Sequence, residues 1–115
     1  MQVIIEVSTP PSRMEKIYRA LLTTRGQLTQ IEAARLAYLS PSAFSHLFTK
    51  HVGKSFRAVR VEIKLQVAAT LLQQTDLSIP EIARHVGYSE RYKLERSFKQ
   101  HYRITPTEYR RANRP

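Results

Sequence analysis

The chain has 115 residues, of which 42% are hydrophobic, enough for one small domain or two very small ones. Lysine and arginine number 19 against 9 acidic residues, and the formal net charge is +10. This charge predicts a polyanionic partner, and nucleic acid rather than a membrane, because no apolar run approaches about 20 residues. The absence of cysteine excludes disulfides, thiolate metal sites and a cysteine nucleophile.

Residues 1–11 are interpreted as an N-terminal tail, weakly extended, and no function is assigned to them. Residues 12–54 are predicted to form a first helical subdomain. Ser12 and Glu15 have the spacing of a capping box, in which hydroxyl and carboxylate each bond a free backbone N–H, and predict a helix to about Thr24. The side chains that this helix is expected to bury are Met14, Ile17, Tyr18, Leu21 and Leu22.

Two short helices follow within this subdomain. A second capping box at 29–32 predicts a helix to about Ala37. Ser40 as N-cap and Pro41 at the first helical position predict the next helix, to about His51. The side chains expected to be buried there are Phe44, Leu47 and Phe48. Two short helices joined by a three-residue turn form a helix-turn-helix.

Residues 55–74 contain no glycine or proline and predict a helix of about 18 residues, roughly 27 Å long, with Ser55 as N-cap. Its apolar residues form two stripes on nearly opposite sides. One stripe contains Phe56, Val59, Ile63, Val67 and Leu71; the other contains Ala58, Val61, Leu65, Ala68, Ala69 and Leu72. Two opposed apolar faces require a partner on each, so this helix either crosses one small core or links two lobes.

The plan of the first subdomain recurs in residues 75–115. Capping boxes at 78–81 and 105–108, a left-handed turn at Gly87 and Ser89 as N-cap predict three more helices. Their predicted last residues are Val86, Tyr102 and Ala112, with Leu94 and Phe98 inward.

The recurrence can be counted. Glu32, Ala34 and Ser40 map onto Glu81, Ala83 and Ser89 at a spacing of 49 residues. Phe44, Phe48, His51 and Ser55 map onto Leu94, Phe98, His101 and Thr105 at a spacing of 50. A duplicated helix-turn-helix explains this better than chance, and it favours the long helix as a linker between two lobes.

In a helix-turn-helix the second helix enters the major groove of DNA. The outward positions of the first such helix are Ser42, Ala43, Ser45, His46 and Thr49. Those of the second are Arg91, Tyr92, Lys93, Glu95, Arg96 and Lys99. Arginine pairs with guanine and glutamate accepts from cytosine, so the second helix is expected to discriminate more between bases. The predicted phosphate contacts are Lys50, Lys54, Arg57, Lys99, Arg110 and Arg111.

Successive major grooves on one face of DNA lie about 34 Å apart, a spacing close to the length of the linker helix. We therefore expect one chain, as a monomer, to read two adjacent grooves of double-stranded DNA. The expected location is the cytoplasm, on the nucleoid, since no signal-peptide pattern opens the chain.

The motifs carry a resemblance to a known family. L-S-P-S-A-F-S-H-L-F-T-K-H-V-G-K-S-F (39–56), I-P-E-I-A-R-H-V-G-Y-S-E (79–90) and S-F-K-Q-H-Y-R-I-T-P-T-E-Y-R (97–110) are similar to the AraC/XylS family of bacterial transcription regulators. Over about 16–111, the resemblance implies seven helices in two helix-turn-helix subdomains, and an activator that contacts RNA polymerase. The base-contacting positions of short MarA-like members correspond to Ser42, Ser45, His46, Arg91, Tyr92, Glu95 and Arg96. Tyr38 and Arg103 stand where the family usually has glycine, which predicts strain in both turns.

The histidines and the weakly charged first recognition helix suggest two other functions. The four histidines, at 46, 51, 85 and 101, lack metal-ligand spacing on one helix, so we expect no metal, no cofactor and no catalytic site. A protein-interaction module, or an antagonist of transcription that has lost specific DNA binding, is the alternative. The two lobes and their linker leave no room for a sensory domain, so the chain is either a short regulator or the output half of a longer one.

Overall fold

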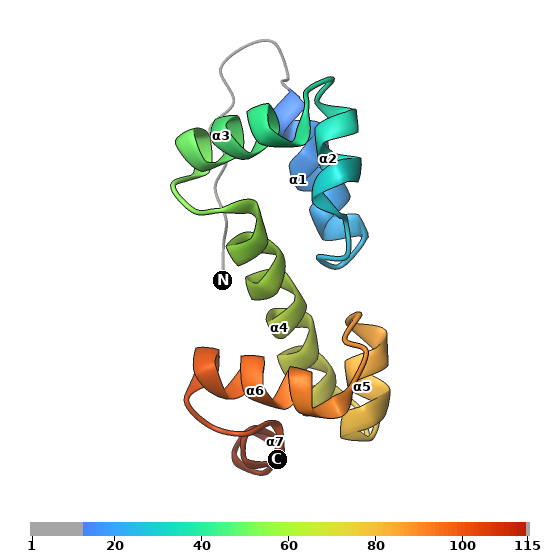
Figure 1. Cartoon of the computed structure of the whole chain (residues 1–115). Helices are drawn as coiled ribbons and strands as arrows, with labels where there is room; N and C mark the ends of the chain where they lie inside the picture. Colours follow the sequence, from blue (N-terminus) through green and yellow to red (C-terminus); the bar gives the residue numbers. More distant parts are fainter. Residues whose placement is uncertain (1–12, 115) are drawn as a thin grey trace. The chain divides into compact units, whose positions relative to one another are not determined.

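The computed structural model describes residues 13–114, which form seven α-helices and no strand within that range (Figure 1). This confirms the all-α prediction. The helices are α1 Arg13–Thr23, α2 Gln30–Leu36, α3 Pro41–Val52, α4 Phe56–Gln74, α5 Ile79–His85, α6 Arg91–Tyr102 and α7 Pro106–Asn113. The predicted tail and the hydroxyl of Ser12 lie outside the described residues. None of the described helices is both long and apolar enough to cross a membrane.

The described part of the chain divides into two compact units between Ile63 and Lys64, and this division falls inside α4. As the lack of glycine and proline predicted, α4 is one unbroken helix of 19 residues. Ser55 is its N-cap, since its hydroxyl accepts the N–H of Ala58 at 3.0 Å.

The first apolar stripe of α4 is buried mainly in the N-terminal half of the helix, and the second mainly in the C-terminal half. Phe56, Val59 and Ile63 are buried in the core of the first unit. The second stripe is buried in the other half of α4, at Leu65, Ala68, Ala69 and Leu72. The helix therefore acts as the last helix of the first unit and the first helix of the second, which explains why its two apolar faces are opposed.

Aromatic rings anchor the second helix of each helix-turn-helix. In the first unit, the Phe56 ring packs edge-on against the rings of Phe44 and Phe48, with both centroid distances 5.2 Å. In the second unit, Phe98 packs 4.5 Å from Tyr102 and edge-on, at 5.3 Å, against Tyr109. These contacts hold α3 against α4 and α6 against α7.

A threonine stabilises the corner that follows α1 in the first unit and α4 in the second. The Thr24 hydroxyl donates to the carbonyl of Ala20 at 2.7 Å and accepts the N–H of Leu28 at 3.0 Å. The Thr75 hydroxyl donates to the carbonyl of Leu71 at 2.6 Å and accepts the N–H of Leu77 at 3.3 Å. The corner satisfies backbone groups that the end of a helix leaves free.

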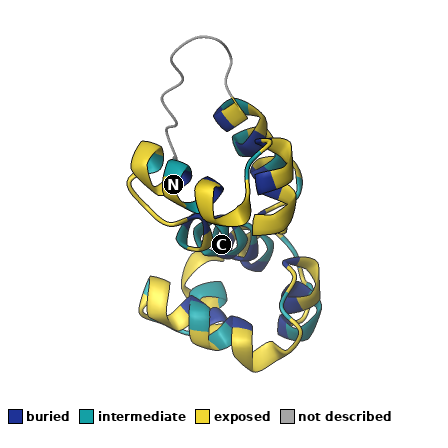
Figure 2. Ribbon diagram, turned by 45° about the horizontal axis from the view of Figure 1, so that its top comes forward, coloured by how far each residue is buried: buried dark blue, intermediate teal, exposed yellow. Residues whose placement is uncertain are grey.

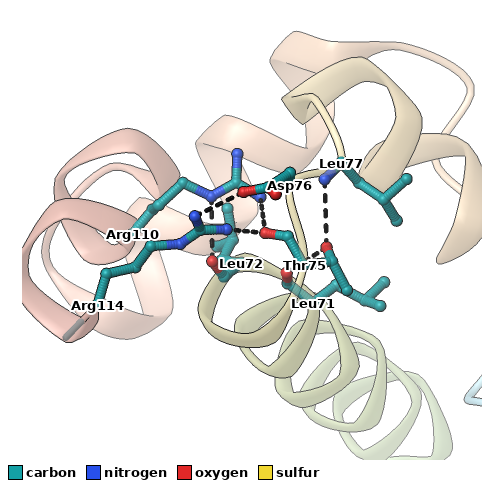
Figure 3. Close-up of polar contacts among 7 residues, drawn as sticks. All are labelled: Leu71, Leu72, Thr75, Asp76, Leu77, Arg110 and Arg114. Atoms are coloured by element: carbon teal, nitrogen blue, oxygen red, sulfur yellow. Dashed lines mark hydrogen bonds and ion pairs between the residues drawn. The ribbon is translucent and has the colours of Figure 1, made fainter.

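An arginine from the last helix of each unit donates hydrogen bonds to carbonyls at this corner, and the two arginines, Arg60 and Arg110, are 50 residues apart. In the first unit Arg60 donates from Nε to the carbonyl of Gly26 at 3.1 Å. In the second unit Arg110 donates from Nε to the carbonyl of Leu72 at 3.0 Å and from Nη2 to that of Thr75 at 3.2 Å (Figure 3). Arg114 also donates to the Thr75 carbonyl and pairs with Asp76. The duplication therefore includes the interactions that join the helices.

Two sequence interpretations were wrong. Leu22 is 50% exposed, because α1 buries Met14, Ile17 and Leu21, and Leu22 lies about 100° around the helix from that stripe. Ser89 does not cap α6. The N-cap is Glu90, whose side chain makes no capping hydrogen bond, and Ser89 accepts instead from Lys93 Nζ at 3.1 Å. The repeat spacing changes from 49 to 50 within this turn, so the extra residue displaces the serine.

The remaining capping boxes are confirmed. Glu32, Glu81 and Glu108 accept the N–H of their N-cap residues at 2.8, 3.0 and 2.9 Å. Each carboxyl pKa lies below its ordinary value of 4.5. The backbone hydrogen bond is the largest cause, and the hydrogen bond with the cap hydroxyl is the second.

These carboxylates predict a loss of stability in acid. Because each pKa is lowered by folding, the stabilisation is present above pH 4.5 and is lost as the pH falls through the lowered value. Replacing all three glutamates by glutamine keeps an acceptor but removes the titration. We expect the melting temperature of the variant to fall less steeply below pH 4.5 than that of the wild type, as followed by circular dichroism. Equal slopes would contradict this account.

Candidate nucleic-acid interface

Local interactions fix the boundaries of α3 and α6. The Ser40 hydroxyl accepts the N–H of Ala43 at the start of α3, with Pro41 in the first turn. Each helix ends at a residue in the left-handed region, Gly53 after α3 and Arg103 after α6. Buried side chains hold one face of each helix, so the opposite face is exposed (Figure 2).

The predicted base-contacting residues of α3 lie on its outer side. Ser42 and His46 are exposed and Ser45 is half-buried, while Phe44 and Phe48 are fully buried beneath them. This surface has short polar side chains and no arginine. It can approach the edges of bases closely but offers few charged hydrogen bonds.

The corresponding residues of α6 are longer and charged. Arg91, Tyr92 and Arg96 are exposed, whereas Glu95 is half-buried. Arg91 Nε lies 3.3 Å from Glu95 Oε2, an ion pair across one helical turn. The pair partly neutralises both groups before any ligand arrives. Tyr92 and Arg96, also one turn apart, remain the most available side chains of the set.

The predicted phosphate contacts fall into three groups. Lys50, Arg57, Lys99 and Arg111 are exposed cations. Lys54 Nζ instead pairs with Glu62 Oε1 at 2.8 Å, and would have to leave it to reach a phosphate. Arg110 is directed inward, and its guanidinium donates to carbonyls at the end of α4 instead of facing a phosphate.

Two residues at the end of α6 were missed from the sequence. Arg96, Lys99, Gln100 and Arg103 line one open hollow on the protein surface. Their spacing of three, four and seven residues places them on one helical face, a signal present in the sequence. Gln100 carries no charge, and Arg103 lies just beyond the end of α6, so neither stands out by charge counting along the helix.

The described residues contain no group of side chains suited to a metal ion. Among residues 13–114, no three histidine or acidic side chains come close enough together to hold a metal ion. The polar side chains of α3 and α6 face outward rather than into an enclosed pocket, an arrangement suited to a large ligand.

Comparison with known proteins identifies the family of this chain. A family model described as a helix-turn-helix domain matches residues 33–112. The HTH-type transcriptional regulator GlxA of Rhizobium meliloti is 42% identical over 86 residues, which are 75% of this chain and 26% of that protein. The chain thus spans about a quarter of this relative's length.

Solved structures share the fold. The C-terminal domain of AraT, a response regulator from Geobacillus stearothermophilus, matches with a TM-score of 0.84 and 27% identity, covering 94% of this chain and 91% of that one. The DNA-binding domain of the global transcriptional factor AdpA, in complex with a target DNA, matches with a TM-score of 0.80 and 24% identity, covering 88% and 92%. On its motifs, its helices and these relatives, the chain belongs to the AraC/XylS family of helix-turn-helix DNA-binding domains.

Proposed function

We propose that this chain binds specific sequences of double-stranded DNA as the output domain of a transcription regulator, with α3 and α6 in the major groove. The observation that carries the proposal is the outer face of α6. There Tyr92 and Arg96 project from a helix whose opposite face is held by the fully buried Leu94 and Phe98. A rigid helix with an exposed arginine provides the bidentate donor that guanine accepts.

The two helices α3 and α6 are proposed to have different roles in DNA recognition. The proposed base contacts are Ser42, Ser45, His46, Arg91, Tyr92, Glu95 and Arg96. The proposed phosphate contacts are Lys50, Lys54, Arg57, Lys99 and Arg111. Because α6 carries the charged base-reading residues, it discriminates among bases, while α3 adds contact area and register.

The proposal extends to two adjacent grooves. One helix, α4, belongs to both units and is 19 residues, or about 28 Å, long. Its length supports the binding of one chain to two grooves about 34 Å apart. Activation of transcription through contact with RNA polymerase is the further step that the family resemblance suggests. A monomer suffices for this arrangement.

The test is selection of bound fragments from random double-stranded DNA with three proteins. The wild type is expected to enrich two short motifs about 10 base pairs apart. Arg96→Ala is expected to lose preference at particular positions of one motif, at a cost of about 1–3 kcal/mol, whereas Lys99→Ala weakens all sequences alike. No enrichment by the wild type would favour the alternative of a protein-interaction module. That alternative is favoured by the short polar side chains at Ser42 and Ser45 of α3 and by the exposed Ile31 and Tyr38.

A further inference from the structure

The residue that ends α6 is in an unfavourable backbone conformation. Arg103 has φ 72°, and its N–H donates to the carbonyl of Lys99 at 2.8 Å. Its counterpart 50 residues earlier, Gly53, has φ 84° and makes the same hydrogen bond to Thr49 at 2.9 Å. Glycine performs this backbone role without strain, whereas a side chain in the left-handed region is disfavoured. Arg25 has a similar conformation, with φ 56°, so the strain alone assigns no function to Arg103, and any function depends on the surroundings of its side chain.

The side chain of Arg103 lies in a positively charged setting. It lines the surface hollow together with Arg96, Lys99 and Gln100. Among the described residues, the three cations Arg96, Lys99 and Arg103 form no ion pair within the protein. The nearby Glu108 carboxylate is held by its capping box with Thr105 and feels the charges of Lys99 and Arg111. The positive charge of the hollow is therefore largely uncompensated.

We propose that Lys99, Gln100 and Arg103 form a phosphate-binding site that grips the DNA backbone beside α6, with Arg96 at its edge. The guanidinium and ammonium groups supply charge, and the amide N–H supplies a neutral donor. The equivalent positions of α3 are Thr49, Lys50 and Gly53, which carry one cation instead of two. This inference rests on the proposed DNA binding, and adds Gln100 and Arg103 to the phosphate contacts of the second unit.

A second exposed arginine with positive φ, outside the hollow, offers a matched control substitution. Arg103→Gly removes one charge and relieves the left-handed strain, and Arg25→Gly does the same at another exposed arginine, with φ 56°. Both variants are expected to raise the melting temperature by about 4 °C. Arg103→Asn, which also tolerates positive φ, serves as a second neutral variant.

The measurement is affinity for the selected DNA site as a function of salt. Arg103→Gly and Arg103→Asn are expected to reduce the steepness of log K against log salt by about 1 and to weaken binding roughly fivefold to tenfold at 0.1 M salt. Arg25→Gly is expected to keep the wild-type slope.

Two results would overturn the inference while leaving DNA binding intact. They are a wild-type slope for both Arg103 variants, or equal losses of affinity for Arg25→Gly and Arg103→Gly. A wild type that binds no double-stranded DNA at all would instead remove the proposed function and this site together.

Discussion

Replacing Phe98 by alanine is expected to destabilise the second unit by about 3–5 kcal/mol and to abolish DNA binding through α6. The Phe98 ring is fully buried and packs against the rings of Tyr102 and Tyr109. Truncation leaves a cavity between α6 and α7, and α6 then loses the support that orients Tyr92 and Arg96 on its outer face.

The measurement is chemical denaturation followed by circular dichroism, together with titration of the selected DNA site. Phe98→Leu keeps most of the volume, and its cost is expected to stay near 1.5 kcal/mol or below. Phe48→Ala, the counterpart in the first unit, should destabilise that unit by a similar amount, since its ring lies against Phe44 and Phe56. If Phe98→Ala costs less than 1 kcal/mol, the ring cluster does not hold α6.

Short-range interactions explain why the helix boundaries were predictable. The capping boxes join residues three apart, so the pairs Thr29 with Glu32, Ser78 with Glu81 and Thr105 with Glu108 can be read directly from the chain. The misassigned cap at Ser89 has a different explanation. Serine is a common N-cap residue, but one extra residue in the turn, relative to the first unit, puts Glu90 at the helix start.

Long-range interactions explain what was missed. Arg110 looked like a surface cation because it lies in a basic segment, yet its partners are carbonyls 35 and 38 residues away. Charge counting cannot distinguish a guanidinium that binds a ligand from one that caps the end of another helix. Leu28 was likewise unassigned, although it is buried, because no periodic pattern surrounds a residue between two helices.

The candidate interface was predictable as a surface but not as a set of interactions. Helical periodicity placed Tyr92 and Arg96 on the outer face of α6, and both are exposed. The sequence also identified the strain at Tyr38 and Arg103, which have φ 58° and 72°. It did not show that Arg91 is paired with Glu95, because side-chain pairing depends on rotamers as well as on spacing.

Val67→Pro is the change expected to have the largest effect on DNA binding. Val67 lies within α4, one turn beyond the point where the two compact units divide. Proline there removes an intrahelical hydrogen bond and clashes with the preceding turn, at a cost of about 3 kcal/mol or more. The residues buried on each side, such as Val59 and Leu72, belong to separate units, so each unit can keep its own core.

With α4 broken, binding by one unit no longer raises the effective concentration of the other. Affinity for the full two-motif site should therefore fall by about 10²–10⁴, while affinity for a single motif changes little. Val67→Ala is the matched control, since it keeps the helix and removes only part of a half-buried side chain. Titrations of full and half sites with both variants distinguish the two losses. Equal binding of the full site by Val67→Pro and Val67→Ala would mean that the units act independently, and that α4 contributes to folding alone.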